Sequence, residues 1–380
     1  MKHFPHFRFT IWLGLVLLAG CAAPEKKESV TNFEFSTSEK FRTLPLPEDV
    51  GQFMLMPQAG DDTYFYLFDF KTNRLLVYTI VDGQLYNSIK FESEGPNGVG
   101  ANVFSFYAES PDEVYVSAGV NTIFRFDSEG VVQQKITIDT KELEEKGISL
   151  FSNIFYKKDN SLYFAAFPMV FAWTELGPKA LTEIPNLVRY DLTEKSFSPL
   201  SYFPAEFVGD NLNKSIFPLL TKGPNEVPMI NLNFRNIYRI SDDSVLTSFA
   251  GHSKFPHDPP VSASPNMFED MPEIMKIIKH VAIYTELVFF ENLDLIVRVA
   301  KFEDIPENVL DDESFVASRW GLVFLDREFN KIGEMELEPG KYNGRYIFAD
   351  EEGIWISTDH PDNPDLSEDV LRFQLIAVKK

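Results

Sequence analysis

Cysteine is almost absent, since the 380 residues include only Cys21. One thiol cannot form an intrachain disulfide or build a cysteine-based zinc cluster. Positive charge is also scarce, with 35 Lys and Arg against 57 Asp and Glu and a formal net charge of −22. Because such a chain repels nucleic acid backbones, we expect no nucleic-acid partner.

Common catalytic motifs are missing as well. The sequence has no Gly-x-Gly-x-x-Gly, P-loop or His-Glu-x-x-His pattern. Gly251-His252-Ser253 begins like a nucleophile elbow, but Phe255 stands where the second glycine is needed. We therefore assign no catalytic residue and no cofactor.

Two groups of polar residues have the donor types of a metal site. His252, His257 and Asp258 could bind a metal together, and carboxylate and amide oxygens near the C-terminus could bind calcium. The latter group consists of Asp359, Asp362, Asn363 and Asp365. Solvated surface loops are the simpler interpretation of both groups, so we predict no metal site.

The N-terminus has the layout of an export signal. Basic residues precede an apolar stretch, Phe9 to Leu18, that is too short to span a bilayer. It ends in Leu18-Ala19-Gly20-Cys21, which resembles the lipobox of bacterial lipoproteins. This resemblance implies that the Cys21 thiol accepts a diacylglycerol, that cleavage before Cys21 frees its amine, and that the amine then receives a further acyl chain such as palmitate. Each buried methylene contributes about 0.8 kcal/mol, so two or more chains anchor a protein stably.

The expected organisation is a signal peptide over residues 1–20, a lipidated cysteine and polar tether over 21–32, and one domain over 33–380. Residue 22 is Ala rather than Asp. By resemblance to lipoprotein sorting, this favours the outer membrane, facing either the periplasm or the cell surface. The partners that we expect are the membrane, through the anchor, and an envelope protein or glycan.

From Phe33 onward, short alternating apolar segments are separated by tight polar turns such as Asp82-Gly83 and Glu129-Gly130. They form about six units, with first strands near residues 64, 113, 161, 229, 287 and 346. One unit cannot bury both faces of its sheet, whereas stacking the units radially does. We predict an all-β, six-bladed propeller, with seven blades as the alternative. Phe33–Phe35 or Phe41–Leu44 would close the ring by pairing with the C-terminal strands.

Two insertions interrupt the units. Residues 250–282 end in an expected short helix with a capping box at Asp270 and Glu273. Its apolar face would pack across one opening of the propeller or contact a partner or membrane. The second insertion, Glu303 to Ser318, is acidic, and we expect an exposed loop.

The lipobox, the repeated strand-and-turn units and the run Glu94 to Gly100 together resemble uncharacterised Bacteroidetes lipoproteins. These proteins carry six-bladed propellers of the TolB-like or NHL-like kind. The resemblance covers about residue 40 to the end, and it implies the fold but no known reaction.

Propeller ligands usually bind at the mouth of the central channel, between blades. The polar groups that we expect there are Gly95, Pro96, Asn97, Asn102, Asn231, Asn233 and Arg235. The alternative role of these residues is turn formation. Trp173, Trp320 and Trp355 could stack on sugars, but burial in the core is the simpler expectation.

The function that these features favour is a non-enzymatic binding or scaffold module of the cell envelope. The alternatives are a glycan-active hydrolase or lyase that uses carboxylates at the propeller mouth, and a receptor-like sensor. An apolar, aromatic mouth would favour binding. Two carboxylates about 5 to 10 Å apart beside an open cleft would favour the enzyme.

Overall fold

A computed structural model describes residues 33–51, 53, 63–100, 103–119, 121–203, 219–231, 236–240, 246–251, 284–301 and 319–379. The contacts within the chain divide it into Met1–Asn32 and Phe33–Lys380. The expected signal peptide, Cys21, the expected helix near residues 270–281 and the expected loop Glu303 to Ser318 lie outside the described residues. No helix in the described residues is both apolar enough and long enough to cross a membrane.

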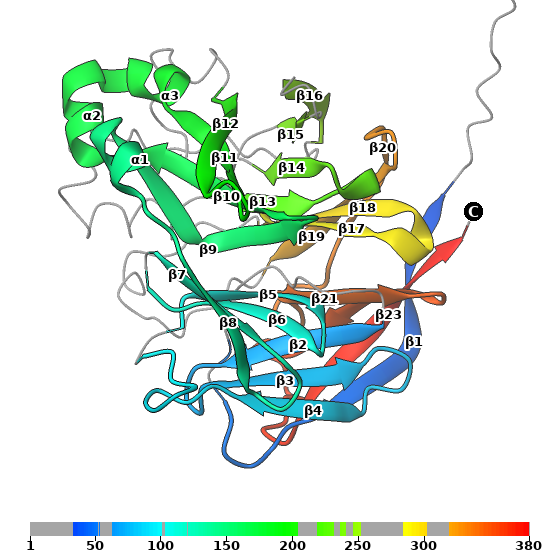
Figure 1. The fold of residues 1–380 in the computed structure, drawn as a ribbon. Helices are drawn as coiled ribbons and strands as arrows, with labels where there is room; N and C mark the ends of the chain where they lie inside the picture. The colour runs from blue at the N-terminus through cyan, green and yellow to red at the C-terminus, as the bar shows by residue number, and fades with distance from the viewer. Residues whose placement is uncertain are drawn as a thin grey trace, which may run out of the picture. The chain divides into compact units, whose positions relative to one another are not determined.

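The described strands form six antiparallel sheets, so the predicted six-bladed propeller is confirmed (Figure 1). Blade 1 contains β2 (Tyr64–Asp69), β3 (Arg74–Thr79) and β4 (Leu85–Lys90). Blade 2 contains β5 (Ser105–Ser110), β6 (Glu113–Ser117), β7 (Thr122–Phe126) and β8 (Val132–Thr137). Blade 3 contains β9 (Ile148–Lys158), β10 (Ser161–Pro168), β11 (Pro185–Asp191) and β12 (Ser196–Tyr202).

The second half of the chain repeats this layout. Blade 4 contains β13 (Leu219–Lys222), β14 (Pro228–Asn231), β15 (Asn236–Ile240) and β16 (Leu246–Ala250). Blade 5 contains β17 (Tyr284–Phe290), β18 (Leu295–Lys301), β19 (Trp320–Asp326) and β20 (Lys331–Glu336). Blade 6 contains β21 (Asn343–Asp350), β22 (Gly353–Ser357), β23 (Val370–Lys379) and, from the start of the domain, β1 (Glu34–Pro45).

Strand β1 closes the ring, as predicted. It runs antiparallel to β23 from the pair Glu34 and Lys379 to the pair Pro45 and Val370, and Figure 1 shows the two strands side by side. The ring of Phe35 stacks on Phe324 of blade 5, with centroids 3.7 Å apart. The N-terminal strand therefore covers the hydrogen-bonding edge that β23 would otherwise expose.

Apolar side chains between neighbouring blades form the core. Five clusters of buried residues each draw on two or three adjacent blades, and together they link all six. Trp320 and Trp355 are fully buried, as expected. No single blade buries its own apolar faces, so the blades stabilise one another, as the sequence pattern predicted.

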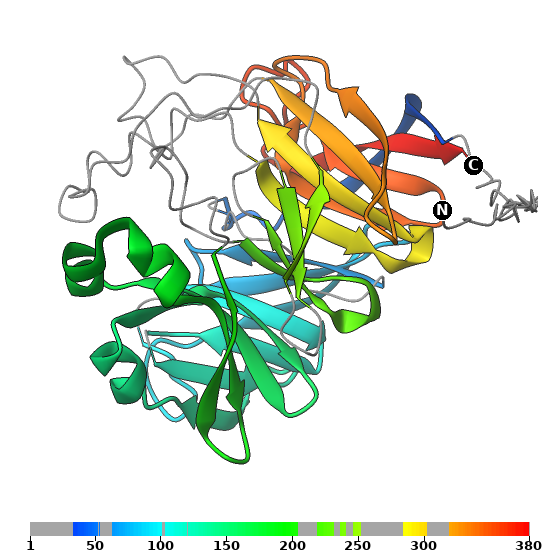
Figure 2. The same ribbon diagram turned by 90° about the horizontal axis from the view of Figure 1, so that it is seen from above.

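Short helices occur where none was predicted. Helix α1 (Lys141–Glu145) precedes β9. The connection from β10 to β11 contains α2 (Val170–Leu176), a 3₁₀ turn (Gly177–Lys179) and α3 (Ala180–Glu183). Two further 3₁₀ turns span Pro224–Glu226 and Glu291–Leu293. Figures 1 and 2 both show α2 and α3, in green, beyond the ends of the strands of blade 3.

The order of the strands distinguishes the two ends of the ring. The innermost strands are β2, β5, β9, β13, β17 and β21. Because neighbouring strands are antiparallel, each innermost strand begins at the end where the second strand of its blade finishes. The connections from second to third strands, including the α2–α3 insertion, therefore leave from this same end. We call it the leading rim.

Candidate functional site

The helical insertion of blade 3 packs against the start of β9 at the leading rim. Ser149 of β9 lies opposite Phe167 of β10 in the strand register. The backbone N–H of Met169 donates to the carbonyl of Gly147, at 2.8 Å. Gly147 has a φ of +72°, and a Cβ there would lie 2.5 Å from the Cβ of Ala172. Only glycine suits this position, because it allows α2 to approach the chain entering β9.

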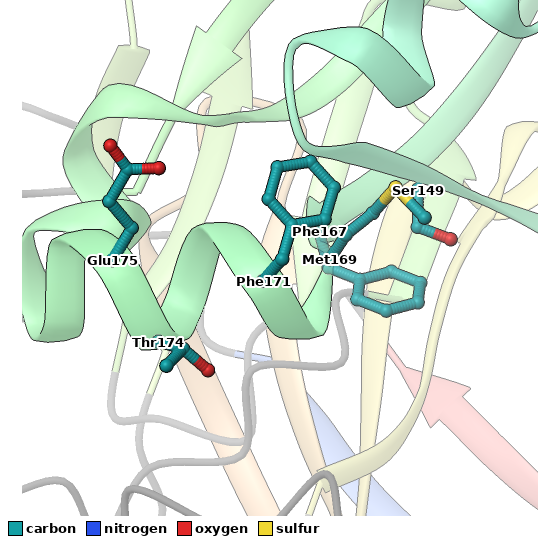
Figure 3. A pocket seen from close by; sticks show the side chains of 6 residues that line it. All are labelled: Ser149, Phe167, Met169, Phe171, Thr174 and Glu175. Carbon is teal, nitrogen blue, oxygen red and sulfur yellow. The ribbon is translucent and has the colours of Figure 1, made fainter.

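A pocket opens beside this contact, with a volume of about 650 Å³ (Figure 3). The lining residues are Ser149, Phe167, Met169, Phe171, Thr174 and Glu175. Phe171 is a large apolar side chain that stays 50% exposed. Pockets of roughly 300–1,000 Å³ with an apolar lining and a few polar groups are typical of small-molecule sites.

The chemistry of the pocket suits binding of an apolar group. Phe167, Met169 and Phe171 supply aromatic and thioether surface, and Ser149 and Thr174 supply hydroxyls. Phe171 and Glu175 are one helical turn apart, and Figure 3 shows both side chains on the same side of α2. The pocket belongs to the insertion of blade 3 and is lined mostly by apolar and aromatic side chains, which suits binding of an apolar group.

A second feature of the leading rim is a buried polar cluster between blades 5 and 6. The register of β17 shifts between Tyr284 and Glu286, which leaves Thr285 as an extra residue. The register of β21 shifts between Asn343 and Ile347. Bulges of this kind change the direction of side chains and occur often near functional sites. Here the two irregularities bring Glu286 into electrostatic contact with Arg345.

Glu286 lies in an unusual environment. It is only 6% exposed, and no residue in the described part of the chain donates a hydrogen bond to its Oε2 atom. Burial raises the pKa of Glu286 to about 8, although the Arg345 guanidinium opposes this shift. Burial also lowers the pKa of Arg345. The carboxyl is therefore held largely in its neutral form at neutral pH.

Asp359 is the second carboxyl of this cluster. Burial raises its pKa to about 6, whereas hydrogen bonds from the Ser357 hydroxyl, at 2.8 Å, and the Arg372 N–H, at 2.9 Å, favour the charged form. Both Asp359 and Glu286 act on the pKa of Tyr346, which burial raises to about 12. The cluster thus couples an arginine, a tyrosine and two carboxyls across one blade boundary.

A glycine positions this part of β21. A Cβ at Gly344 would overlap the ring of Trp320 and lie 2.9 Å from Cγ1 of Val299. The backbone of blade 6 therefore touches the buried aromatic ring of blade 5 directly. This close approach places Arg345 and Tyr346, which follow Gly344 in the chain, at the boundary with Glu286.

The binding residues predicted from sequence do not gather in one place in the described structure. Gly95 and Pro96 are exposed in the connection after β4, and the side chain of Asn97 accepts a hydrogen bond from the N–H of Val132, at 3.2 Å. Val132 begins β8, the outermost strand of blade 2, so Asn97 lies away from the innermost strands. Asn231 ends β14 in blade 4.

The remaining residues of that set, Asn102, Asn233 and Arg235, lie outside the described residues, as does Cys21. The ligand role of the whole set stays a prediction. The side chain of Trp173 also lies outside what the structure describes.

Of the two possible metal sites, the structure describes only the one near the C-terminus. His252, His257 and Asp258 lie outside the described residues. Near the C-terminus, Asn363 donates to the Thr358 carbonyl, at 2.5 Å, and accepts from the N–H of Asp365, at 3.1 Å. Within the described ranges, no three His, Cys, Asp or Glu side chains are grouped to hold one ion.

The sequence contains a signal for the pocket that was not recognised. After Phe164, apolar residues continue through Phe167, Met169 and Phe171, and no turn-forming pair such as Asp-Gly ends the strand. Pro168 is the one residue in this run that disfavours a continuing strand. When apolar residues continue past the expected end of a strand, the segment that follows can be an insertion that presents aromatic side chains.

Comparison with known proteins gives a family and a fold. A family model described as a domain of unknown function, DUF4221, matches residues 32–336. A crystal structure of a DUF4221 family member from Bacteroides vulgatus is 16% identical, with a TM-score of 0.74, and the match covers 92% of this chain and 99% of that one.

A putative exported protein from Bacteroides fragilis is 12% identical, with a TM-score of 0.51, and the match covers 93% of this chain and 97% of that one. At these identities, the two structures support the fold alone. Among curated proteins, none matches this chain.

Proposed function

This chain belongs to the DUF4221 family, a propeller family of unknown function, and from that premise we propose that it is an outer-membrane lipoprotein that binds an apolar ligand. It would act as a non-enzymatic binding module of the cell envelope, with the blade 3 pocket as its site. The observation that carries this proposal is the apolar, aromatic pocket of about 650 Å³ at the leading rim.

A hydrolase or lyase is less well supported by the same rim. A general acid must come within hydrogen-bonding distance of the atom that it protonates. Glu286, which has the strongly raised carboxyl pKa, is 6% exposed and is buried between two blades. We therefore assign the Glu286 cluster to the packing of blades 5 and 6, and ligand binding to the pocket.

The pocket is tested by replacing Phe171 with serine. Losing a half-buried aromatic side chain removes roughly 1.5 kcal/mol or more of apolar contact, so affinity for the neutral apolar dye Nile red should fall about 10-fold. Dye fluorescence is titrated with a chain that begins at Phe33, which lacks both the lipidated cysteine and the apolar N-terminal segment. Phe70→Ser is the matched control, since Phe70 is 44% exposed in another blade. Equal losses in both variants, or no saturable binding by the parent chain, would contradict the proposal.

The anchor is supported by Leu18-Ala19-Gly20-Cys21 and by the polar, Pro-containing tether that follows. The similar Bacteroides fragilis protein is described as a putative exported protein, which agrees with export of this chain. Export and anchoring place the pocket outside the cytoplasm.

Cys21→Ser should abolish incorporation of labelled palmitate and move the protein from the membrane pellet to the soluble fraction or leave it uncleaved. Two acyl chains account for stable anchoring, and serine has no thiol to receive them. Ser29→Ala in the tether is the control and should remain in the pellet. Unchanged labelling and fractionation of Cys21→Ser would contradict lipidation.

A further inference from the structure

We infer that the ligand of the blade 3 pocket is a small organic ammonium ion, an aromatic or aliphatic group that carries a positive charge. This inference rests on the proposed binding function and specifies its ligand class. It follows from the combination of side chains in the lining and from the charge around it.

Among the described residues that line the pocket, Glu175 is the one charged side chain. It is exposed at the margin, whereas Phe167 and Met169 are partly buried. A ligand can therefore place an apolar group against the aromatic rings and direct a charged group toward the carboxylate. A neutral apolar ligand would leave this carboxylate unused, and an anionic one would be repelled by it.

Aromatic rings add to the preference for a cation. The face of a phenylalanine ring attracts an ammonium group within about 6 Å of its centroid. Phe171 and Glu175 lie on one side of α2, so a ring and a carboxylate are presented together (Figure 3). This pairing of an aromatic face with an acidic group is the chemistry that recognises organic ammonium ions.

The net charge of the chain also favours a cation. Helix α1 leads directly into Gly147, which touches α2, and it carries Lys141 as well as Glu142, Glu144 and Glu145. Lys146 is paired with Glu142, at 2.6 Å. With a formal charge of −22 over the whole chain, the long-range field favours the approach of cations.

Isothermal titration calorimetry with two matched probes tests this inference. The probes are 2-phenylethylammonium and its neutral counterpart 2-phenylethanol, titrated into the chain that begins at Phe33. We expect the ammonium to bind about 5- to 10-fold more tightly. Glu175→Gln should reduce this preference to near unity while leaving 2-phenylethanol unchanged. Glu183→Gln, an exposed acid on α3 outside the pocket lining, should keep the preference.

Three results would overturn the inference. They are equal affinity for both probes, a preference that survives Glu175→Gln, and tighter binding of a lysine-containing peptide, acetyl-Phe-Lys-amide, than of the small amine. If neither probe binds but Phe171 still determines binding of Nile red, the ammonium ligand is wrong and the proposed pocket stands. If Nile red binding also fails, the proposed function falls.

Discussion

The parent chain should lose folding stability as the pH rises from about 4.5 to about 8, and the Glu286→Gln variant should not show this loss. The ordinary pKa of this carboxyl is 4.5, and burial between blades 5 and 6 raises it to about 8. Between these values, the folded chain keeps a proton that the unfolded chain has released. Folding stability therefore falls with rising pH across this interval.

The size of this effect follows from the shift. Each pKa unit corresponds to about 1.4 kcal/mol, so the full shift would give a fall of up to about 5 kcal/mol. Glutamine has the same shape and cannot ionise, so its contribution is constant with pH. Asp359, whose raised pKa gives a loss in the same direction near pH 6, is still present in the variant and cancels in the comparison.

Urea unfolding at pH 5, 6, 7 and 8 measures the difference. The stability of Glu286→Gln relative to the parent chain should rise steadily with pH, and most of the gain should appear by pH 8. Glu291→Gln is the control, because Glu291 is exposed in the turn directly after β17. Parallel pH curves for the parent chain and Glu286→Gln would show that Glu286 titrates normally in the folded protein.

Removing β1 should have the largest effect on stability. A chain that begins at Leu46 lacks the strand that covers β23, and with it Leu44, which is 1% exposed. It also lacks Arg42, whose guanidinium lies 4.0 Å from the ring centroid of Trp355 and forms a 2.8 Å ion pair with Asp350. We expect a loss of at least about 5 kcal/mol, comparable to the entire stability of many domains.

A chain that begins at Phe33 keeps β1 and serves as the control. It should melt cooperatively and elute as a single species, whereas the chain that begins at Leu46 should aggregate through the exposed edge of β23. Size-exclusion chromatography and thermal melts followed by circular dichroism measure both effects. A soluble Leu46 chain that melts at the control temperature would show that β1 is not needed for closure.

The strands of the blades were predictable where hairpin turns mark them. Asp82-Gly83 and Glu129-Gly130 contain glycines with positive φ, and each sits between paired strands as expected. Alternating apolar residues then fixed the neighbouring strands. These signals are local, since a turn and its two strands lie within a few residues of each other.

The innermost strands β5, β9 and β13 were missed, each for a physical reason. Strand β13 has only four residues, Leu219–Lys222, and β5 ends in the polar pair Glu109 and Ser110. The register of β9 shifts between Phe151 and Phe155, which breaks the alternation that marks a strand. Innermost strands contact the neighbouring blades, so their environment depends on distant parts of the sequence.

The same reason explains which site features were missed. The raised pKa of Glu286 depends on its burial against β21, and nothing near Glu286 in the sequence indicates that environment. The pocket depends on the contact of α2 with Gly147, and these two segments are separated in the sequence by the strands β9 and β10. Polar loop residues such as Asn97 were easier to select from sequence, but the structure uses the Asn97 side chain to cap an outer strand.

The pairing of β1 with β23 also constrains when this protein can complete its fold. The two strands come from opposite ends of the domain, so the first strand of the domain cannot pair until β23 has been synthesised. Contacts between such distant segments form slowly. Until Val370–Lys379 has been synthesised, the ring stays open. Under the proposed export, the chain would pass through a translocation channel before this final seam is made.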